Sequence, residues 1–310
     1  MRAAILREYG TVPELADHPE PTGPDVVEVL AAGMNPVDIR IATGTFPLER
    51  YDPPYVAGKE AVERRRDGTL TYFEYAVKPF GAFAEKTQLA PGDGYPLPEG
   101  LDPALAVCLG VSGLAAWLGL EWRGRLQRGE TVLVLGASGV VGQIAVQAAK
   151  LLGAARVVAA GRDPERLAKA AVLGADVTVQ IGEHDDLAAA LREAAGGDGP
   201  DYVFDALWGA PAAAAVLAAA PWARFVNLGQ SAGPTAELAS GAVRGKNLTI
   251  LGHVAFGVPH KVLAEHYPRL VGHAAAGEIR LDVERVPLAD VGDAWRRQAA
   301  GEAAKLVLVP

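Results

Sequence analysis

A strand, a glycine-rich turn and a helix follow one another in the middle of this 310-residue chain. The apolar run 131–135 is typical of a strand buried on both faces in a parallel sheet. The turn Gly136–Gly142 (GASGVVG) leads into an apolar segment that ends at Gly153, and we expect this segment to form a helix. Glycines let backbone N–H groups approach phosphates, and a helix N-terminus adds a positive dipole end. The order therefore predicts a pyrophosphate site, with a purely structural turn as the alternative.

The same alternation of strand and helix continues to residue 252. Asp163 is a good N-cap, because a proline follows it at the first helical position, and Gly174 is typical of a helix end. Six strands joined by crossovers predict a doubly wound parallel sheet, which binds ligands at the carboxyl ends of its strands. After residue 135, we expect strands at 156–160, 177–181, 202–206, 224–229 and 248–252, with helices at 163–174, 185–195, 210–220 and 236–243.

The two ends of the chain have a different pattern. Short strand-like pieces separated by proline and glycine predict a compact, mainly β domain in the first hundred residues. The final segment is mixed, with an expected helix at 260–275, a strand at 281–286, a helix at 288–299 and an edge strand at 305–309.

Composition excludes several classes of function. A formal net charge of -8 argues against nucleic acid as the main partner. The apolar stretches are shorter than the ~18 residues that a membrane span needs, and the charged N-terminus does not resemble a signal peptide. The single cysteine, Cys108, lies in an apolar run, so we expect a buried side chain and no internal disulfide. The six histidines form no tight ligand motif. These features predict a reduced, soluble, cytoplasmic protein with no membrane partner.

Short motifs at both ends of the chain carry a family resemblance. Gly33–Asp38 (GMNPVD) resembles G-x-N-P-x-D, and Gly58–Glu60 (GKE) resembles G-x-E. Gly113–Trp117 (GLAAW) resembles G-L-T-A-Y, and the ending Ala304–Pro310 (AKLVLVP) resembles G-K-[IV]-V-L-x-P. Together with the seven-residue glycine turn, they resemble the medium-chain dehydrogenase/reductase family, and within it the zinc-free quinone oxidoreductase (zeta-crystallin-like) group.

This resemblance implies an α/β fold with two domains. A GroES-like, β-rich catalytic domain would comprise residues 1–110 and 257–310, with a Rossmann nucleotide-binding domain of residues 111–256 inserted between them. In zinc-dependent relatives the positions of Asn35 and Lys59 hold a cysteine and a histidine ligand. An amide and an ammonium are poor substitutes for a thiolate and an imidazole, so we expect no zinc.

The residue at the end of the second parallel strand is expected to choose between NAD and NADPH. A carboxylate there would bind the ribose hydroxyl of NAD, but this chain has Gly161 followed by Arg162, with Arg166 further along. Two guanidinium groups around one turn suit a phosphate, so we expect NADPH. The alternative is that both arginines are ordinary surface residues and that Asp163 serves NAD. The family's tyrosine after the third strand is Ile181 here, which weakens the comparison on the adenine side.

The resemblance assigns cofactor contacts to four segments of the chain. The expected cofactor-binding residues are Gly136, Ala137, Ser138, Gly139, Val140, Val141, Gly142, Gly161, Arg162, Arg166, Gly229, Gln230, Ser231, Ala255 and Phe256.

For catalysis, the resemblance places Asn35, Asp38 and Lys59 around the pocket, together with the loop 45–55. Our hypothesis is that Lys59 pairs with Asp38 and stabilises a developing oxyanion. A structural ion pair or an exposed lysine is the alternative. Tyr51 and Tyr55 are alternative acids, although surface packing also explains them.

Three departures from the family pattern bear on the reaction. A pocket tyrosine is replaced by Phe46, a threonine by Ala115, and the serine of the alcohol dehydrogenases' proton relay by Val37. Without zinc or relay, ordinary alcohol oxidation is not expected.

Three functions are then open. The first is an NADPH-dependent reductase of a quinone or related enone, the second an enoyl-thioester or 2-alkenal reductase, and the third an NADPH-binding protein with incidental catalysis. Loops 46–55 and 208–211 are expected to select the substrate. Many members of the family are homodimers, and residues 248–253 offer a plausible sheet edge for such pairing.

Overall fold

The computed structural model describes residues 1–91, 94–301 and 304–310. The chain divides into two compact units. The first comprises Met1–Ser112, Pro259–Gly277 and Asp282–Pro310, and the second comprises Gly113–Val258 and Glu278–Leu281. The last of these segments groups with the second unit because the Gln147 side chain binds the backbone of Arg280. It donates to the carbonyl at 2.9 Å and accepts from the N–H at 2.8 Å.

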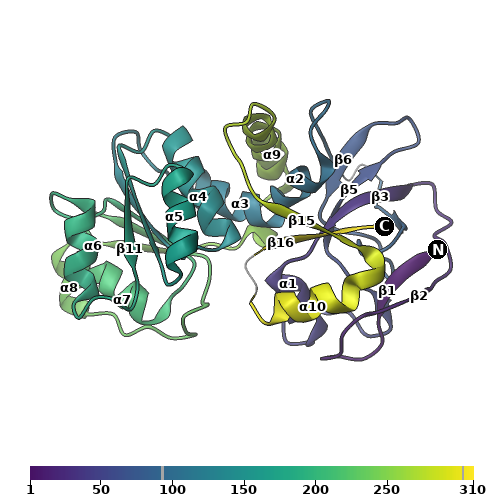
Figure 1. Cartoon of the computed structure of the whole chain (residues 1–310), viewed down its shortest axis with the longest axis horizontal. Coiled ribbons are helices and arrows are strands. Elements are labelled where there is room, and N and C mark those ends of the chain that lie inside the picture. Colours follow the sequence, from purple (N-terminus) through teal and green to yellow (C-terminus); the bar gives the residue numbers. More distant parts are fainter. Residues whose placement is uncertain (92–93, 302–303) are drawn as a thin grey trace. The chain divides into compact units, whose positions relative to one another are not determined.

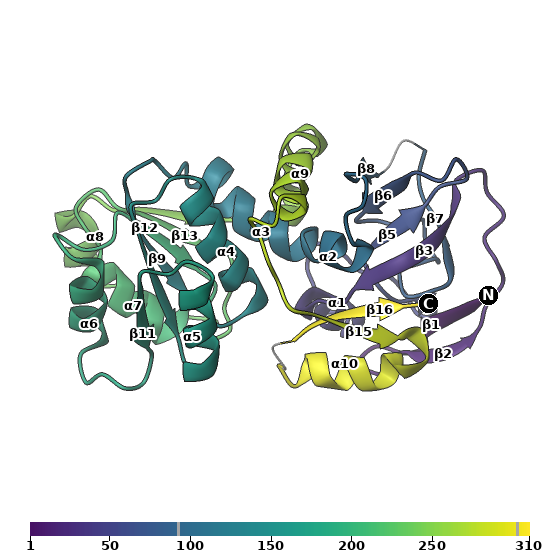
Figure 2. The same cartoon turned by 45° about the horizontal axis from the view of Figure 1, so that its top comes forward.

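The second unit is built on one sheet of six parallel strands in the order β11-β10-β9-β12-β13-β14 (Figure 2). This is the strand order of the Rossmann fold, and it confirms the predicted doubly wound sheet. The direction of the chain through the sheet reverses between the neighbouring strands β9 and β12, where ligands bind such sheets. The strands are β9 (Thr131–Leu135), β10 (Arg156–Gly161), β11 (Val177–Gln180), β12 (Tyr202–Asp205), β13 (Arg224–Asn227) and β14 (Thr249–Gly252).

Helices cover both faces of this sheet. Helices α4 (Val140–Leu151) and α5 (Pro164–Val172) lie on one face (Figures 1 and 2). Helices α6 (Leu187–Ala195) and α7 (Gly209–Ala218) pack together on the other, next to α8 (Ser240–Gly245). The unit also contains most of α3 (Val111–Leu118) and a π-helical turn, Gly119–Arg123. Because β9 and β12 are buried on both faces, their side chains are apolar at almost every position.

The first unit is mainly β. A sheet in the order β2-β1-β4 is antiparallel, and a larger sheet has the order β15-β16-β3-β5-β6-β8, with β7 also paired to β3. The strands of the smaller sheet are β1 (Arg2–Leu6), β2 (Glu14–Asp17) and β4 (Tyr55–Val56). Those of the larger are β3 (Val26–Gly33), β5 (Glu60–Arg64), β6 (Leu70–Phe73), β7 (Lys86–Gln88), β8 (Tyr95–Pro96), β15 (Val283–Pro287) and β16 (Lys305–Val309). The helices are α1 (Pro36–Ala42), α2 (Pro103–Cys108), α9 (His260–Ala275) and α10 (Val291–Ala299).

Two elements differ from the sequence-based prediction. The strand β16 was expected at an edge, but it pairs with β15 on one side and β3 on the other, so that prediction is wrong. Four of its five residues are buried, as an interior strand requires, whereas three of the five residues of its outer neighbour β15 are exposed. The helix expected at 236–243 is α8, which begins only at Ser240. Residues 236–239 form no regular helix.

Each unit has its own apolar core. The first centres on residues such as Leu6, Met34 and Phe83, and the second on residues such as Leu133, Val203 and Val216. Cys108 is fully buried, as expected, and burial raises its pKa to about 12. In the described parts of the chain, the helices are too short or too polar to cross a membrane.

Candidate active site

The glycine turn lies at the carboxyl end of β9 and opens the first turn of α4. The N–H groups of Gly136 and Ala137 both donate to the carbonyl of Ala160, which ties the turn to the neighbouring strand β10. Gly136 has a φ of +87°, which a residue with a side chain rarely adopts. Gly139 is the N-cap of α4 and provides no side-chain cap. The first N–H groups of the helix therefore have neither an intrahelical acceptor nor a side-chain cap, as an anion site requires.

The other two glycines of the turn have different reasons to be glycine. A Cβ at Gly142 would lie 2.2 Å from the carbonyl oxygen of Gly136, so only glycine lets the helix pack this closely on the strand. A Cβ at Gly139 would meet only that carbonyl oxygen, at an ordinary 3.5 Å. Packing within the protein does not demand glycine there, whereas the close approach of a phosphate would.

The end of β10 lacks a carboxylate, as predicted. A Cβ at Gly161 would lie 2.4 Å from the Ser138 hydroxyl oxygen, so the turn itself fills the place of a side chain. Arg162 is exposed, and the Arg166 guanidinium lies 3.3 Å from the carboxylate of Asp163. Asp163 also caps α5 by accepting from the Arg166 N–H at 3.1 Å, which confirms its predicted role as N-cap.

The ends of β12 and β13 are joined by a polar cluster that the sequence did not single out. Asp205 is buried and accepts from the N–H groups of Leu207 and Trp208, and from the Asn227 amide at 2.7 Å. The same amide donates to the carbonyl of Gly229, which fixes the loop that begins there. Burial raises the pKa of Asp205, although these donors act in the opposite direction.

The remaining predicted cofactor residues follow the ends of β13 and β14. Gln230 and Ser231 are exposed, and the Ser231 hydroxyl donates to the carbonyl of Ala206. Ala255 and Phe256 belong to a short 3₁₀ turn after β14. Sheet topology thus brings all four predicted segments to the carboxyl edge of one sheet.

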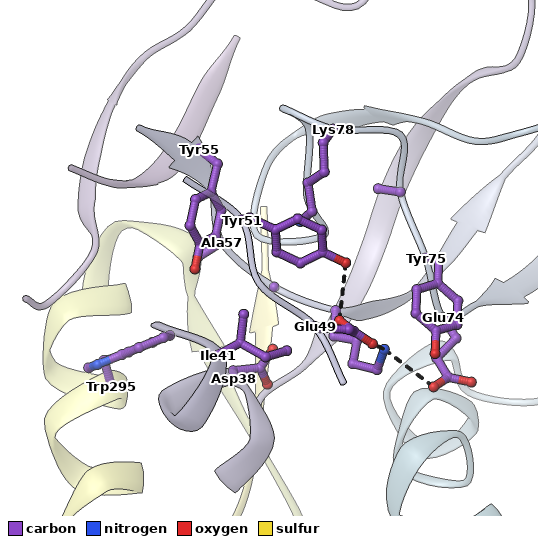
Figure 3. Close-up of a pocket in the computed structure, with 13 residues that line it drawn as sticks. Asp38, Ile41, Glu49, Tyr51, Tyr55, Ala57, Glu74, Tyr75, Lys78 and Trp295 are labelled. Carbon is purple, nitrogen blue, oxygen red and sulfur yellow. Dashed lines mark hydrogen bonds and ion pairs between the residues drawn. The ribbon is translucent and has the colours of Figure 1, made fainter. Parts of the chain in front are cut away.

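A pocket in the first unit contains two of the three predicted catalytic residues (Figure 3). It is small, about 20 Å³, which is room for a water-sized group. Charged and aromatic side chains dominate its lining. They include Asp38, Glu49, Tyr51, Tyr55, Lys59, Glu74, Tyr75, Lys78 and Trp295.

Lys59 is the most enclosed cation of this pocket, with a side chain only 2 % exposed. Its ammonium pairs with the carboxylates of Glu49 and Glu74, the latter at 3.5 Å, and both acids are labelled in Figure 3. It also lies 3.6 Å from the centre of the Tyr75 ring. The hypothesis paired Lys59 with Asp38, whereas these two ion pairs join it to acids from two other segments. Glu49 and Glu74 belong to none of the sequence motifs, so only the fold shows that they lie next to Lys59.

Asp38 instead turns back to its own helix. Its carboxylate accepts from the Asn35 N–H at 2.8 Å, at the start of α1. Burial raises its pKa to about 7, the hydrogen bond from Asn35 acts against this shift, and the negative charge of Glu60 reinforces it.

The two tyrosines proposed as alternative acids also line the pocket. The Tyr51 hydroxyl donates to Glu49 at 3.1 Å, and Tyr55 is buried in β4. Burial raises the pKa of both hydroxyls, so both stay protonated at neutral pH. Lys78 lies over their rings, and burial lowers its pKa to about 8.

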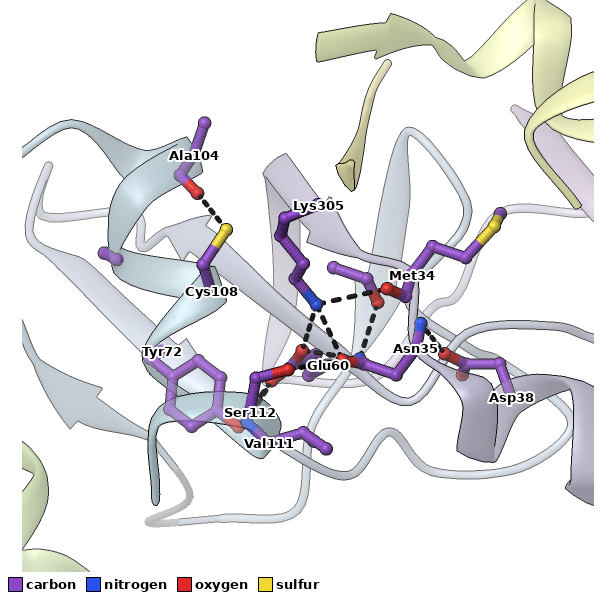
Figure 4. A network of polar contacts seen from close by, with 12 residues as sticks. Met34, Asn35, Asp38, Glu60, Tyr72, Ala104, Cys108, Val111, Ser112 and Lys305 are labelled. Atoms are coloured by element: carbon purple, nitrogen blue, oxygen red, sulfur yellow. Dashed lines mark hydrogen bonds and ion pairs between the residues drawn. The ribbon is translucent and has the colours of Figure 1, made fainter. Parts of the chain in front are cut away.

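Asn35 lies in a buried polar network next to the pocket (Figure 4). Its amide oxygen accepts from Lys305 at 2.6 Å and from the Ser112 hydroxyl at 3.1 Å. Its amide nitrogen donates to Glu60 at 2.7 Å and to the Gly33 carbonyl at 3.2 Å. These four hydrogen bonds use both donors and the oxygen of the Asn35 amide. The side chain therefore links Gly33, Glu60, Ser112 and Lys305 within the network.

Glu60 is the fully buried centre of that network. Its carboxylate also accepts from the Tyr72 hydroxyl at 2.9 Å and the Val111 N–H at 2.6 Å, and lies 3.6 Å from the Lys305 ammonium. In the sequence, Glu60 and Lys305 stand out only as parts of motifs. A lysine at the start of an apolar strand was the one available signal of a buried ion pair.

Comparisons with known proteins give the same family. Residues 140–271 match a family described as zinc-binding dehydrogenases. The quinone oxidoreductase of Pseudomonas aeruginosa is 28% identical over 296 residues, which is 91% of this chain and 90% of that protein. Quinone oxidoreductase-like protein 2 of Mus musculus is 30% identical, over 81% of this chain and 74% of that protein.

A much larger protein also contains a similar segment. A phenolphthiocerol/phthiocerol polyketide synthase subunit of Mycobacterium tuberculosis is 30% identical over 298 residues. These residues cover 91% of this chain but only 13% of the synthase subunit.

Among solved structures, the quinone oxidoreductase of Thermus thermophilus is 30% identical and has a TM-score of 0.85, with both chains covered completely. Its fold, and with it the assignment of a GroES-like first unit and a Rossmann second unit, extends over the whole chain. The chain belongs to the medium-chain dehydrogenase/reductase family, in its quinone oxidoreductase group.

Proposed function

We propose that this protein is an NADPH-dependent, zinc-independent reductase that acts on a quinone or a related activated enone. The observation that carries the proposal is the end of β10. Ser138 fills the place of a carboxylate beside Gly161, and two arginines follow within five residues. The structure of the Thermus thermophilus relative, which was also determined as a complex with NADPH, supports the same cofactor.

The residues present fit this cofactor. The glycine turn would hold the pyrophosphate, Arg162 and Arg166 the 2′-phosphate, and the loops at 229–231 and 255–256 the nicotinamide end. When bound, the cofactor supplies a hydride. The chain must bind it, orient the substrate and manage charge and protons.

Donor chemistry does not fit zinc at the positions that hold it in zinc-dependent relatives. Asn35 gives both ends of its amide to protein partners, and the Lys59 ammonium would have to lose its proton and its two carboxylates. Within the described residues, no three His, Cys, Asp or Glu side chains cluster in a way that could hold a metal ion. We therefore assign no step to zinc.

The pocket suggests how reduction is assisted. A carbonyl or quinone oxygen gains negative charge as hydride adds, and in this proposal the Lys59 ammonium, whose side chain is 2 % exposed, stabilises that charge. Asp38 is a second group of the pocket that can hold a proton near neutral pH. Asn35 serves as a positioning residue, since its N–H orients the Asp38 carboxylate.

A second candidate is an enoyl-thioester or 2-alkenal reductase. The similarity to a polyketide synthase subunit favours it, because the matched segment covers nearly all of this chain. Steady-state oxidation of NADPH with an ortho-quinone, a 2-alkenal and an enoyl-thioester separates the candidates. Preference for the thioester selects the second candidate, and tight NADPH binding with no turnover of any substrate contradicts both in favour of a cofactor-binding protein.

Replacement of Lys59 tests the proposed oxyanion group. Lys59→Met should lower kcat by roughly a hundredfold while the Kd of NADPH, measured by fluorescence titration, stays the same. Lys78→Met is the matched control, because it removes a cation that lines the same pocket, and should change kcat little. Equal kcat values for wild type and Lys59→Met would rule out this role.

The assembly we propose is a homodimer paired through β14. This strand ends the sheet of the second unit, and three of its four residues are exposed. Light scattering of wild type and of Ile250→Pro, which removes a backbone donor from that edge, tests the proposal.

A further inference from the structure

Lys59 is held by two carboxylates that come from different segments. Glu49 lies in the loop between α1 and β4, and Glu74 follows β6 directly. Both line the pocket with Lys59 (Figure 3). A lysine needs one carboxylate to balance its charge, so the second is available for another task.

The two carboxylates differ in their surroundings. Glu49 has a further donor, the Tyr51 hydroxyl, and its side chain is 10 % exposed. Glu74 is more deeply buried, and its Oε1 atom lies 3.5 Å from the Lys59 ammonium but has no hydrogen-bond partner in the described part of the chain. Of the pair, Glu74 therefore gains more from carrying a proton.

The charges around Glu74 also favour its protonated form. Burial raises its pKa to about 7, and the negative charges of Glu60 and Glu49 add to the shift. Lys59 is the cation that opposes it. The ring of Tyr75 packs over the Lys59 ammonium, and Asp38 is a separate acid of the same pocket.

We propose that Glu74 is the proton source that recharges Lys59 in each turnover, an inference that rests on the proposed reductase function. Hydride adds to the electrophilic carbon of the substrate, and its electron pair ends on the substrate oxygen. The Lys59 ammonium gives that oxygen a proton and becomes an amine. Glu74 passes its carboxyl proton to the amine, and water then returns a proton to the Glu74 carboxylate.

An infrared titration of the protein alone tests the pair without turnover. The carbonyl stretch of protonated carboxylic acids is followed from pH 5 to pH 9 in wild type, Glu74→Gln, Asp38→Asn and Glu49→Gln. We expect Glu74→Gln and Asp38→Asn each to lose a different component that titrates near pH 7, and Glu49→Gln to keep both. If Glu74→Gln leaves the spectrum of wild type unchanged, Glu74 carries no proton and the proposal fails.

The pH profile of kcat gives the second readout, measured with the best substrate of the panel. In wild type kcat should fall as pH rises through about 7, because Glu74 then loses the proton that it supplies. Glu74→Gln should lower kcat by roughly tenfold to a hundredfold and remove this inflection. Glu49→Gln should keep it, and Glu74→Asp should restore it in part.

The outcomes separate this inference from the proposed function. An inflection that survives in Glu74→Gln and disappears in Asp38→Asn would assign the proton to Asp38 and overturn the role of Glu74. If wild type oxidises NADPH with no member of the panel, the reductase function fails, and the infrared result still reports whether Glu74 holds a proton.

Discussion

Lys305 shows how much one buried charge can hold together. Its ammonium donates to the Met34 carbonyl and the Asn35 amide, and it lies 3.6 Å from Glu60. We expect Lys305→Met to lower the free energy of unfolding by about 3–5 kcal/mol, because it leaves the Glu60 carboxylate buried without its cation. Urea denaturation measures the change.

The matched control for Lys305 is a lysine on the surface. Lys86 forms an exposed ion pair with Glu20, so Lys86→Met should cost at most about 1 kcal/mol. Similar losses for the two variants would mean that the buried network contributes no more than a surface pair.

Arg162 and Arg166 provide a second prediction at the residue scale. If they bind the 2′-phosphate, Arg162→Ala/Arg166→Ala should weaken NADPH binding by roughly a hundredfold and leave NADH binding nearly unchanged. Fluorescence titration with both cofactors measures this difference. An equal loss for NADPH and NADH would contradict a phosphate-binding role.

Individual residues were the hardest level to predict from the sequence. Asn35, Asp38 and Lys59 were identified together by motif, and the structure places two of them in one pocket. The ion partners of Lys59 were missed, because Glu49 and Glu74 are 10 and 15 residues away along the chain and are joined to it only by the path of the loop and of β6. Motifs identify the residue types, but distant loops decide which charges meet.

At the scale of elements, the glycine turn makes a sharp prediction. Gly139→Ala should leave the melting temperature nearly unchanged, because its Cβ meets only an ordinary contact. It should weaken NADPH binding by roughly tenfold, about 1.4 kcal/mol, because the methyl group stands where a phosphate approaches.

Gly142→Ala is the contrasting variant within the same turn. Its Cβ would clash with the Gly136 carbonyl, so we expect a clear fall in melting temperature. Differential scanning fluorimetry and cofactor titration of both variants check the pair. A folded Gly139→Ala that binds NADPH like wild type would favour a purely structural turn.

Strands and helices were predicted best where an apolar run is bounded by residues that end a strand. Strands β9, β10 and β12 begin at the predicted residues, because they are apolar runs bounded by glycine or by charged residues. The edge position of β16 was predicted wrongly, since a five-residue strand says nothing about which neighbours it will have. Strand order depends on contacts between distant segments, which local patterns do not encode.

For the whole molecule, the two raised carboxyl pKa values predict how stability depends on pH. In the folded state Asp38 and Glu74 hold their protons up to about pH 7, whereas in the unfolded chain they lose them near pH 4. Their contribution to stability is present below about pH 4 and is lost as pH rises to about 7. His253 acts in the opposite direction, because burial lowers its pKa to about 4 and the stability it gives is lost below pH 6.5.

A variant comparison isolates the two carboxyls. The double variant Asp38→Asn/Glu74→Gln should lose less stability than wild type between pH 5 and pH 7.5, as measured by melting temperature. Parallel melting curves for the two proteins would contradict the raised pKa values.

The position of β16 in the chain fixes the order in which the two units can complete their sheets during synthesis. During synthesis, the second unit is almost contiguous, so most of its sheet can form soon after residue 258 is made. The larger sheet of the first unit is completed later, since β3 can pair with β5 and β7 early but with β16 only once residues 305–309 are made. Until then the carboxylate of Glu60 lacks its lysine. We therefore expect nascent chains to carry a folded nucleotide-binding unit between two unfinished halves, which is when chaperones would be needed most.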